Sequence, residues 1–552
     1  MSLEPAPLPP RYYLKNFERL CATVADQYSD LMNQRERDCL DIFAGCSIDG
    51  RCLFVRLASR RGPLFRVEQL AYPELDDLDQ ALEEITRVGL LEEIEGPSVA
   101  DLIRVLRRDE LMALGSELLS LTGRERKGDL AEQLLELPEE DVVAAWLRWR
   151  SPDQRLVEVA YSAEIELYQI LFFGNSYQTL TEFVLSDLGI ASFHDYPLDR
   201  DHRLFGSREE IDDYIALRAL KVLFKEAVAG EEIEVVNLIG SYLQNEASHG
   251  LVSTPYRDAL RNRVARQLER YELREQAIDL YERSALHPAR ERRARLLIAT
   301  GADEAAVDLC EAIEATPCCE AEVDFARRQL PGLRRRLNRD YVPLSRDRFA
   351  EDHLELPREP RVEMAAARHY AAEWREVHHA ESRLINASFG LAFWEQIFQP
   401  VPGAFINPFQ SAPLDMFSGT FYANRRQSID GRMEELAGGA LAGELLAAFD
   451  RYQGVSNRWV GWRGLSRELL AAALEQVPTA HWLACWKRLL FDPEANRNGC
   501  PDLVALDDEL GYCLIEVKGP GDQLQLNQRR WLRFFQRQGI PAKVARVSWI
   551  DA

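Results

Sequence analysis

Two apolar segments near the C-terminal end, separated by an acidic turn, constrain this chain most. They are LVAL (503–506) and YCLIEV (512–517), and the intervening DDELG (507–511) ends in glycine. Short apolar segments around such a turn predict a β-hairpin. A helix at 523–538 and a strand at 542–549 follow. The order strand, strand, helix, strand predicts that 361–552 is an α/β domain, opening with helices over 362–398.

The predicted hairpin carries three charges that an apolar strand would not carry for packing alone. Asp502 precedes the first strand behind Pro501, and Glu516 and Lys518 stand two apart in the second. Residues two apart in a strand face the same side, so Glu516 and Lys518 share a face and the hairpin can bring Asp502 beside them. Isolated charges in a core are costly unless they are paired or bound to a metal.

Two carboxylates a few ångströms apart repel each other unless a cation lies between them. Oxygen ligands favour Mg²⁺ or Mn²⁺ over zinc. Such an ion lowers the pKa of a bound water and polarises a phosphodiester, and the ammonium of Lys518 could orient that water or stabilise the developing negative charge. The alternative at this stage is a surface hairpin with an ordinary Lys–Glu pair.

Composition limits the class of protein. The chain has 552 residues, which suggests about three to five domains. Its formal net charge of −23 argues against a protein that coats nucleic acid non-specifically. Only seven residues are lysine, so arginine, the better bidentate phosphate ligand, carries almost all positive charge. No apolar run approaches a membrane span, and the start does not resemble a signal peptide, so we expect a cytoplasmic protein with reduced cysteines.

The N-terminal region, 1–97, reads as helices closed by a hairpin. A helix is expected over 35–46, two strands over 52–67 around Arg-Arg-Gly-Pro, and an amphipathic helix over 75–94. This order resembles a winged-helix module, and a generic α+β packing domain is the alternative.

The next region, 98–140, gives two short helices around a basic turn. Thr122 and Gly123 are expected to open the second helix, with Arg124, Arg126 and Lys127 at its N-terminus. Backbone N–H groups there favour phosphate, so the region resembles a SAP motif, a small DNA-binding unit. A plain helical linker is the alternative.

Residues 141–360 are expected to be mainly helical. The segments 277–288 and 306–317 align with an offset of 29 residues, and both end at proline. They resemble a degenerate tetratricopeptide-like array, followed by a charged connector with some extended pieces over 331–360. Arg257 and Arg261 lie four apart on one expected helix, where they could clamp phosphate or simply face solvent.

Several stretches together resemble a known family. Pro501-Asp502-Leu503-Val504, then Glu516-Val517-Lys518-Gly519-Pro520, then Gln528 and Trp531, resemble the VRR-NUC domain of the PD-(D/E)XK superfamily. Upstream, His379-Ala380-Glu381 and the stretch 407–426, which contains Pro-Leu-Asp, resemble segments of the Fanconi-associated nuclease family. The order of regions also matches, so the chain resembles a bacterial member of that family: a mainly α, multidomain protein with a C-terminal α/β nuclease domain.

The resemblance implies an endonuclease and 5′ exonuclease that depends on one or two Mg²⁺ or Mn²⁺ ions. It would cleave branched DNA near 5′ flaps and act in DNA repair, including repair of interstrand cross-links. Carried over by position, Glu381, Asp502 and Glu516 become metal ligands, with the Val517 backbone carbonyl, and Lys518 becomes the catalytic lysine. Glu381 is expected on a helix.

Some positions depart from the family pattern. Asn527 and Glu494 stand where eukaryotic members carry basic residues, which leaves part of a 5′-phosphate pocket absent or built otherwise. Candidate DNA contacts are Arg124, Arg126, Lys127, Arg257, Arg261, Arg497 and Gln528.

Other readings stay open. The chain could be a junction resolvase or restriction-like nuclease of the same fold, or a catalytically weak helical scaffold that binds DNA. A monomer or homodimer, associated with the bacterial nucleoid during repair and with no membrane contact, is expected.

Overall fold

A computed structural model describes residues 11–60, 62, 64–151, 154–175, 192–245 and 250–550. The chain divides into two compact units, Met1–Ile190 and Ala191–Ala552. None of the helices in the described ranges combines the length and the apolar character needed to cross a bilayer. The domain boundaries inferred from the sequence stay predictions.

The first unit is helical around a small sheet. Its N-terminal helices are α1 (Tyr12–Tyr28), α2 (Gln34–Gly45), α3 (Ile48–Ala58) and α4 (Leu78–Arg87), with a short 3-10 turn at Val67–Gln69. The sheet has the order β1-β3-β2, with strands β1 (Leu64–Arg66), β2 (Leu91–Glu93) and β3 (Leu156–Val159). Helix α9 (Ser162–Phe173) packs against α1. The expected helix at 35–46 is confirmed by α2, whereas the one expected at 75–94 is confirmed only over α4 and is wrong at its end, which forms β2.

The expected hairpin over 52–67 is wrong in its first half. Residues 52–58 belong to α3, which begins where the Ser47 side chain accepts a hydrogen bond from the Gly50 N–H. The apolar residues Leu53, Phe54 and Leu57 are fully buried, a spacing that suits one face of a helix. Strand β1 instead pairs antiparallel with β3, far along the sequence. The apolar run at 52–58 is nearly continuous, so its spacing fits a strand as well as a helix.

The region after residue 98 contains more helices than expected: α5 (Val99–Val105), α6 (Arg108–Gly115), α7 (Lys127–Leu135) and α8 (Glu139–Trp149). Thr122 and Gly123 were expected to open the second helix of this region, but they do not open α7. Glu125 accepts hydrogen bonds from the N–H and hydroxyl of Thr122 and so closes a separate turn. Helix α7 then begins at Lys127, with Arg126 as its N-cap.

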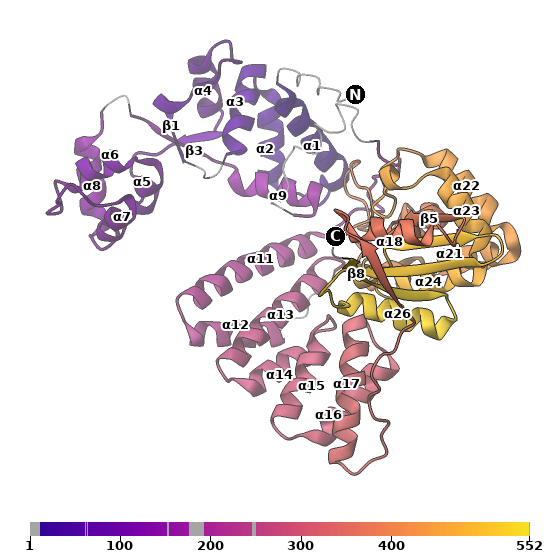
Figure 1. The fold of residues 1–552 in the computed structure, drawn as a ribbon. Coiled ribbons are helices and arrows are strands. Elements are labelled where there is room, and N and C mark those ends of the chain that lie inside the picture. Colours follow the sequence, from indigo (N-terminus) through magenta and orange to yellow (C-terminus); the bar gives the residue numbers. More distant parts are fainter. Residues whose placement is uncertain are drawn as a thin grey trace. The chain divides into compact units, whose positions relative to one another are not determined.

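The second unit begins with an array of consecutive helices that pack on one another (Figure 1). They are α11 (Arg208–Ala229), α12 (Ile233–Asn245), α13 (Ser253–Arg270), α14 (Arg274–Glu282), α15 (Ala289–Ala299), α16 (Asp303–Ala315) and α17 (Glu320–Arg336). The two aligned segments at 277–288 and 306–317 overlap α14 and α16. Buried small and apolar residues, such as Ala277, Leu280, Ala306 and Cys310, form the contacts between helices. The structure therefore has the helical array that the repeat predicted.

The C-terminal part contains a five-stranded sheet of order β4-β8-β7-β6-β5. The strands are β4 (Glu351–Pro357), β5 (Glu376–His379), β6 (Leu503–Asp507), β7 (Gly511–Lys518) and β8 (Ala542–Ile550). Strands β6 and β7 form the predicted antiparallel hairpin, while β7, β8 and β4 run parallel. Helix α18 (Val362–Tyr370) covers one face, and α26 (Leu526–Gln538) packs on the other through Trp531 and Phe535.

The remaining helices pack mainly on the face that α26 covers. They are α19 (Arg383–Ala392), α20 (Trp394–Ile397), α21 (Thr420–Glu435), α22 (Leu441–Tyr452), α23 (Arg467–Gln476), α24 (Thr479–Phe491) and α25 (Pro493–Asn496), with a π turn at Leu436–Ala440 and a 3-10 turn at Trp462–Gly464. The expectation of helices throughout 362–398 is wrong at β5, and the connector contributes an edge strand, β4. Both strands are short or polar, so neither shows a long apolar run.

Candidate active site

The β6–β7 hairpin brings the three predicted charges to one end of the sheet. Leu503 pairs with Ile515, and this register places Asp502 opposite Glu516. Alternation along β7 directs Val517 into the core on the α18 face, so Glu516 and Lys518 share the opposite face. The predicted juxtaposition of the acids is therefore confirmed by the strand pairing.

Glu516 and Lys518 are both buried and form an ion pair. Glu516 is 1% exposed and Lys518 8% exposed, and Lys518 Nζ lies 2.9 Å from Glu516 Oε1. Burial, and next the negative charge of Asp502, raise the pKa of Glu516 to about 7 despite the lysine. Asp502 adds a second acid beside this buried pair, which packing alone would not favour. The arrangement therefore indicates a functional site.

Asp502 connects the hairpin to the segment that carries Glu381. Its Oδ2 accepts a hydrogen bond of 2.8 Å from the Val517 N–H. Its backbone carbonyl accepts two more, each 2.9 Å, from the N–H groups of Ala380 and Glu381. Burial raises the pKa of Asp502, and the nearby charges of Glu363 and Glu381 raise it further. One aspartate thus fixes the relative positions of three segments.

The sequence had suggested that Glu381 lies on a helix, but the structure places it in a turn. It follows β5 directly and precedes α19, in a turn where its φ is 29°. A positive φ is uncommon for a residue with a side chain. The two hydrogen bonds to the Asp502 carbonyl hold this turn against β6. The turn presents the exposed Glu381 side chain at the same end of the sheet as Asp502.

A cavity of about 460 Å³ lies at this end of the sheet and contains side chains that sequence reasoning missed. Glu363, Arg361 and Arg383 line it together with Glu381. Glu363 lies in the first turn of α18, close enough to Asp502 to influence its pKa. Because Glu363 stands far from the hairpin in sequence, no spacing could have indicated it. The cavity therefore combines acids with arginines that could contact a phosphate.

The carboxylates suit a hard divalent cation by the chemistry of their oxygens. The charge of Glu381 raises the pKa of both Asp502 and Glu516, and the charge of Asp502 also raises that of Glu516, which is the response expected of acids that lack a compensating cation. Within the described residues, no three or more His, Cys, Asp or Glu side chains are arranged closely enough to form a complete metal site. By donor type and charge alone, Asp502, Glu516 and Glu381 fit a divalent metal.

The basic residues predicted near the SAP-like turn are all exposed, and they differ in their contacts. Arg124 and Arg126 are exposed at the start of α7. Lys127 donates a hydrogen bond of 2.8 Å to the Leu106 carbonyl, which ties the turn to α5. The lysine therefore has a structural contact, although all three side chains are exposed to solvent.

Arg257 and Arg261 lie inside the helical array. Arg257 is 1% exposed and pairs with Asp213 at 2.7 Å. Arg261 donates to the Leu243 and Arg283 carbonyls and pairs with Asp258 at 3.0 Å. These contacts favour a role in joining helices over a phosphate clamp.

Arg497 and Gln528 both lie near the hairpin and both have local partners. Arg497 pairs with Glu494 at 3.0 Å and its guanidinium lies 4.6 Å from the centre of the Phe417 ring. The Gln528 side chain accepts a hydrogen bond from the Gln525 N–H and caps α26. Their predicted contacts with DNA stay predictions.

Two family models match parts of this chain. Residues 11–92 match the family described as "FAN1, HTH domain", and residues 441–549 match the VRR-NUC domain. A Fanconi-associated nuclease 1 homolog from Pseudomonas aeruginosa is 33% identical, over 99% of this chain and 98% of its own. The homolog from Oryza sativa is 26% identical over 97% of this chain, which spans 62% of that protein.

A solved structure is also similar. The crystal structure of paFAN1 bound to gapped DNA with a 2-nucleotide 5′ flap has a TM-score of 0.82 and a sequence identity of 31%. The similarity covers 99% of this chain and 100% of that chain. The resemblance noted in the sequence and the mainly helical fold with a C-terminal nuclease domain are confirmed. The chain belongs to the Fanconi-associated nuclease 1 family.

Proposed function

We propose that this protein is a structure-selective DNA nuclease that depends on Mg²⁺ or Mn²⁺ and cleaves near 5′ flaps, in DNA repair that includes interstrand cross-links. The observation that carries the proposal is the cluster of Asp502, Glu516 and Lys518 on one hairpin. The relative bound to 5′ flap DNA supports the choice of substrate.

Asp502, Glu516 and Glu381 would hold the metal, with one or two ions and the Val517 carbonyl as a further ligand. A bound divalent ion supplies a water of lowered pKa and polarises the phosphodiester. The paired ammonium of Lys518 would offset negative charge that develops on the phosphate during cleavage. Burial of the Glu516–Lys518 pair strengthens these interactions, because the surroundings screen charge poorly.

One cleavage panel tests the proposal. End-labelled 5′ flap, 3′ flap, four-way junction and plain duplex are each incubated with Mg²⁺, Mn²⁺ or EDTA. We expect cleavage near the 5′ flap with either metal and none in EDTA. The Asp502→Ala variant should be inactive, and Glu509→Ala, which removes an exposed acid from the turn of the same hairpin, should be active.

Other outcomes would contradict the proposal in distinct ways. Preferred, symmetric cleavage of the four-way junction would indicate a resolvase of the same fold. Binding without cleavage of any substrate would indicate a DNA-binding scaffold. Equal activity of Asp502→Ala and the wild type would remove the hairpin from the mechanism altogether.

A further inference from the structure

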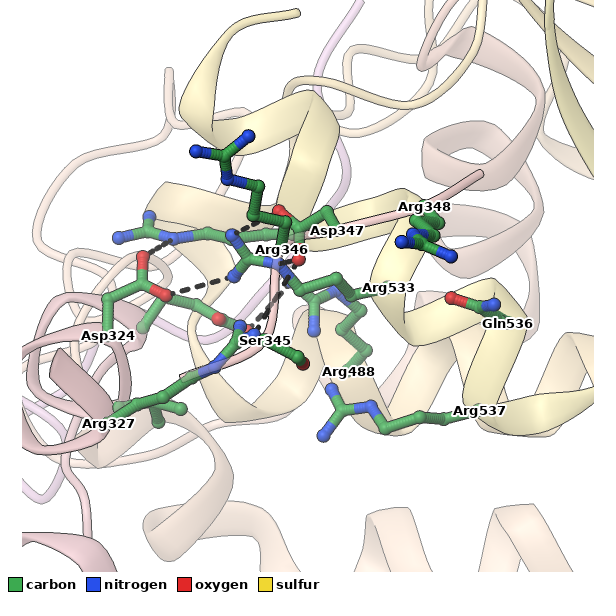
Figure 2. Close-up of a pocket in the computed structure, with 13 residues that line it drawn as sticks. Asp324, Arg327, Ser345, Arg346, Asp347, Arg348, Arg488, Arg533, Gln536 and Arg537 are labelled. Atoms are coloured by element: carbon green, nitrogen blue, oxygen red, sulfur yellow. Dashed lines mark hydrogen bonds and ion pairs between the residues drawn. The ribbon is translucent and has the colours of Figure 1, made fainter. Parts of the chain in front are cut away.

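A strongly basic pocket of about 720 Å³ lies where the helical array meets the nuclease domain, apart from the carboxylate cluster. Its walls come from α17, the segment 345–348, α24 and α26 (Figure 2). Seven arginines and three acids line it, which leaves an excess of four positive charges. Such a concentration is notable in a chain whose net charge is −23.

The acids of the pocket join the two parts of the unit. Asp324 on α17 contacts Arg530 Nε at 2.7 Å and Arg533 Nη1 at 3.2 Å, both on α26. Asp347 contacts Arg533 Nε at 2.8 Å. These ion pairs give Arg530 and Arg533 a structural role, and Figure 2 shows Arg533 in contact with both Asp324 and Asp347.

Other arginines of the pocket have no such role. Arg346, Arg348 and Arg537 line it and are exposed, and within the described residues they form no ion pair. The ion pairs of Asp324 and Asp347 already hold α17 and the segment 345–348 against α26, so these three arginines are not needed for that contact. Their positive charge is therefore free to attract an anion.

Arg488 on α24 gives an independent indication. It is 8% exposed, and its Nε has no hydrogen-bond partner in the part of the chain that the structure describes. Its Nη2 lies 2.9 Å from Glu320 Oε1, an ion pair without hydrogen-bond geometry. Burial lowers the pKa of Arg488, and the charges of Arg537 and Arg530 lower it further. Glu320 balances the charge of this buried guanidinium, but its unsatisfied N–H donors remain costly until an acceptor such as a phosphate oxygen joins them.

The pocket is connected to the catalytic hairpin through a few contacts. The Arg488 guanidinium lies 4.8 Å from the centre of the Trp531 ring. Trp531 Nε1 donates to the carbonyls of Asn496 and Asn498, at 3.2 Å each, in the segment that leads to Pro501 and Asp502. Along α26, Arg537 lies about 15 Å from Asn527, which packs on Gly499. That distance corresponds to roughly four nucleotides of one DNA strand at about 3.4 Å each.

We propose that this pocket binds backbone phosphates of a DNA strand that extends from the active site. Guanidinium groups bind phosphate through paired N–H donors, and the pocket offers several from different directions. The assignment rests on the proposed nuclease function for the identity of the strand, whereas the phosphate chemistry rests on the pocket alone.

The test compares a pocket variant with a matched control in the full-length protein. The pocket variant is Arg346→Ala/Arg537→Ala, which removes no ion pair. The control is Arg274→Ala/Arg335→Ala, which removes two exposed arginines from α14 and α17 outside the pocket. Equilibrium binding of a 5′ flap DNA is measured in EDTA at several salt concentrations, so that the result can be read whether or not the protein cleaves DNA.

We expect the Kd of the pocket variant to rise about tenfold. The slope of log K against log salt concentration should fall in magnitude by about 1 to 2, because binding with fewer phosphate contacts releases fewer counterions from the DNA. The control should match the wild type. Equal Kd and equal slope in the pocket variant and the control would overturn the proposal.

A second arm distinguishes DNA from a free anion. The melting temperatures of the wild type and the pocket variant are measured with and without inorganic phosphate. Stabilisation by phosphate that is lost in the pocket variant, together with unchanged DNA binding, would overturn the assignment to a DNA strand and indicate a site for a small anion.

Discussion

At the scale of single residues, Lys518 is the group whose role can be isolated most cleanly. It is a buried lysine beside two acids, and its ammonium is paired with Glu516. We predict that Lys518→Ala lowers the rate of cleavage about 10²–10³-fold, the usual effect of removing one group that stabilises transition-state charge. Binding of DNA in EDTA should change little. Single-turnover cleavage assays measure the first effect and equilibrium binding the second.

The control for this prediction is Lys487→Ala, which removes an exposed lysine from α24. Its cleavage rate should equal that of the wild type. Activity of Lys518→Ala within a few-fold of Lys487→Ala would show that the ammonium has no catalytic role.

Asp502 gives a prediction about stability. A ligand that binds only the folded state stabilises it by about 2.7 kcal/mol at a concentration of 100 times its Kd. Mn²⁺ should therefore raise the melting temperature of the wild type and of Glu509→Gln. It should not raise that of Asp502→Asn, which keeps the shape of the side chain and removes its charge. An equal shift in all three proteins would mean that Mn²⁺ binds elsewhere.

At the scale of elements, the start of α26 lies directly against the segment before Asp502. Gly499 has a φ of +89°, and a Cβ there would come within 2.8 Å of Asn527 Cγ and 2.9 Å of the Asn527 backbone carbon. We predict that Gly499→Ala lowers the free energy of unfolding by about 2–4 kcal/mol, because backbone strain and overpacking add. It should also reduce cleavage, since α26 must shift relative to the catalytic hairpin.

Gly511 provides the matched control, because its φ is +78° and a Cβ there would meet nothing within 4 Å. Gly511→Ala should cost about 1 kcal/mol from strain alone. Denaturant unfolding of both variants separates the two contributions. Equal losses in the two variants would contradict the close contact between α26 and the hairpin.

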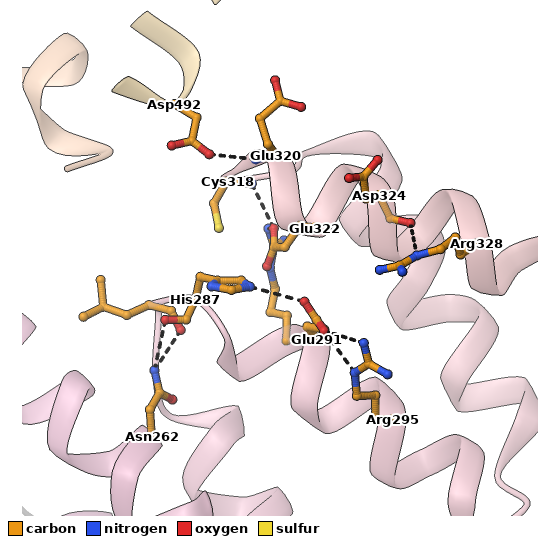
Figure 3. A network of polar contacts seen from close by, with 12 residues as sticks. Asn262, His287, Glu291, Arg295, Cys318, Glu320, Glu322, Asp324, Arg328 and Asp492 are labelled. Atoms are coloured by element: carbon orange, nitrogen blue, oxygen red, sulfur yellow. Dashed lines mark hydrogen bonds and ion pairs between the residues drawn. The ribbon is translucent and has the colours of Figure 1, made fainter. Parts of the chain in front are cut away.

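The helical array contains a pH-dependent contact at the start of α15 (Figure 3). His287 Nε2 lies 3.3 Å from Glu291 Oε2, and Glu291 also pairs with Arg295 at 2.7 Å. The hydrogen bond with Glu291 raises the pKa of His287 above 6.5, and the same bond lowers that of Glu291 to about 2. The histidine therefore stabilises the fold below pH 6.5 and loses this effect as pH rises through its raised pKa. The glutamate contributes above pH 4.5 and loses its effect as pH falls towards 2.

It follows that His287→Gln should lower the melting temperature at about pH 5.5 and have little effect at about pH 9, where the histidine is neutral. Glu291→Gln should lower it at both values, because Arg295 stays charged. Thermal melts at the two pH values test this. A loss of stability in His287→Gln that is the same at both would contradict a charged pair.

The sequence predicted the parts of the site that lie on one hairpin. Spacing along β7 gives the relation of Glu516 to Lys518, and the turn gives the position of Asp502, because both are local properties of strands. Family resemblance indicated Glu381 but placed it on a helix. Its turn is held by the Asp502 carbonyl, a contact between distant segments that no local pattern records.

Similar reasons explain the errors elsewhere in the fold. The apolar run at 52–58 fits strand and helix alike, and packing against the N-terminal helices decides for α3. Strand β5 has a single apolar residue, Val377, and exists because it adds to an edge of the sheet. The basic pocket, built from α17, α24, α26 and the segment 345–348, could not be read from the sequence because its arginines are dispersed.

At the scale of the whole molecule, an acidic protein must bind an acidic polymer. The net charge of −23 repels DNA, so binding depends on local groups of arginine. We predict that affinity for 5′ flap DNA falls steeply as salt increases, with a slope of about −0.9 for each phosphate that the protein neutralises in duplex DNA. Fluorescence anisotropy in EDTA between low and moderate salt measures the slope. An affinity that does not change with salt would contradict arginine–phosphate contacts.

The central claim, that the acids at the end of the β6–β7 hairpin bind a divalent ion, has one direct test. Crystals soaked in Mn²⁺ and measured at the manganese absorption edge would reveal the ion by anomalous scattering. The account predicts a peak between the side chains of Asp502 and Glu516, within reach of Glu381. A map with no peak there, or with peaks only at other acids, would contradict it.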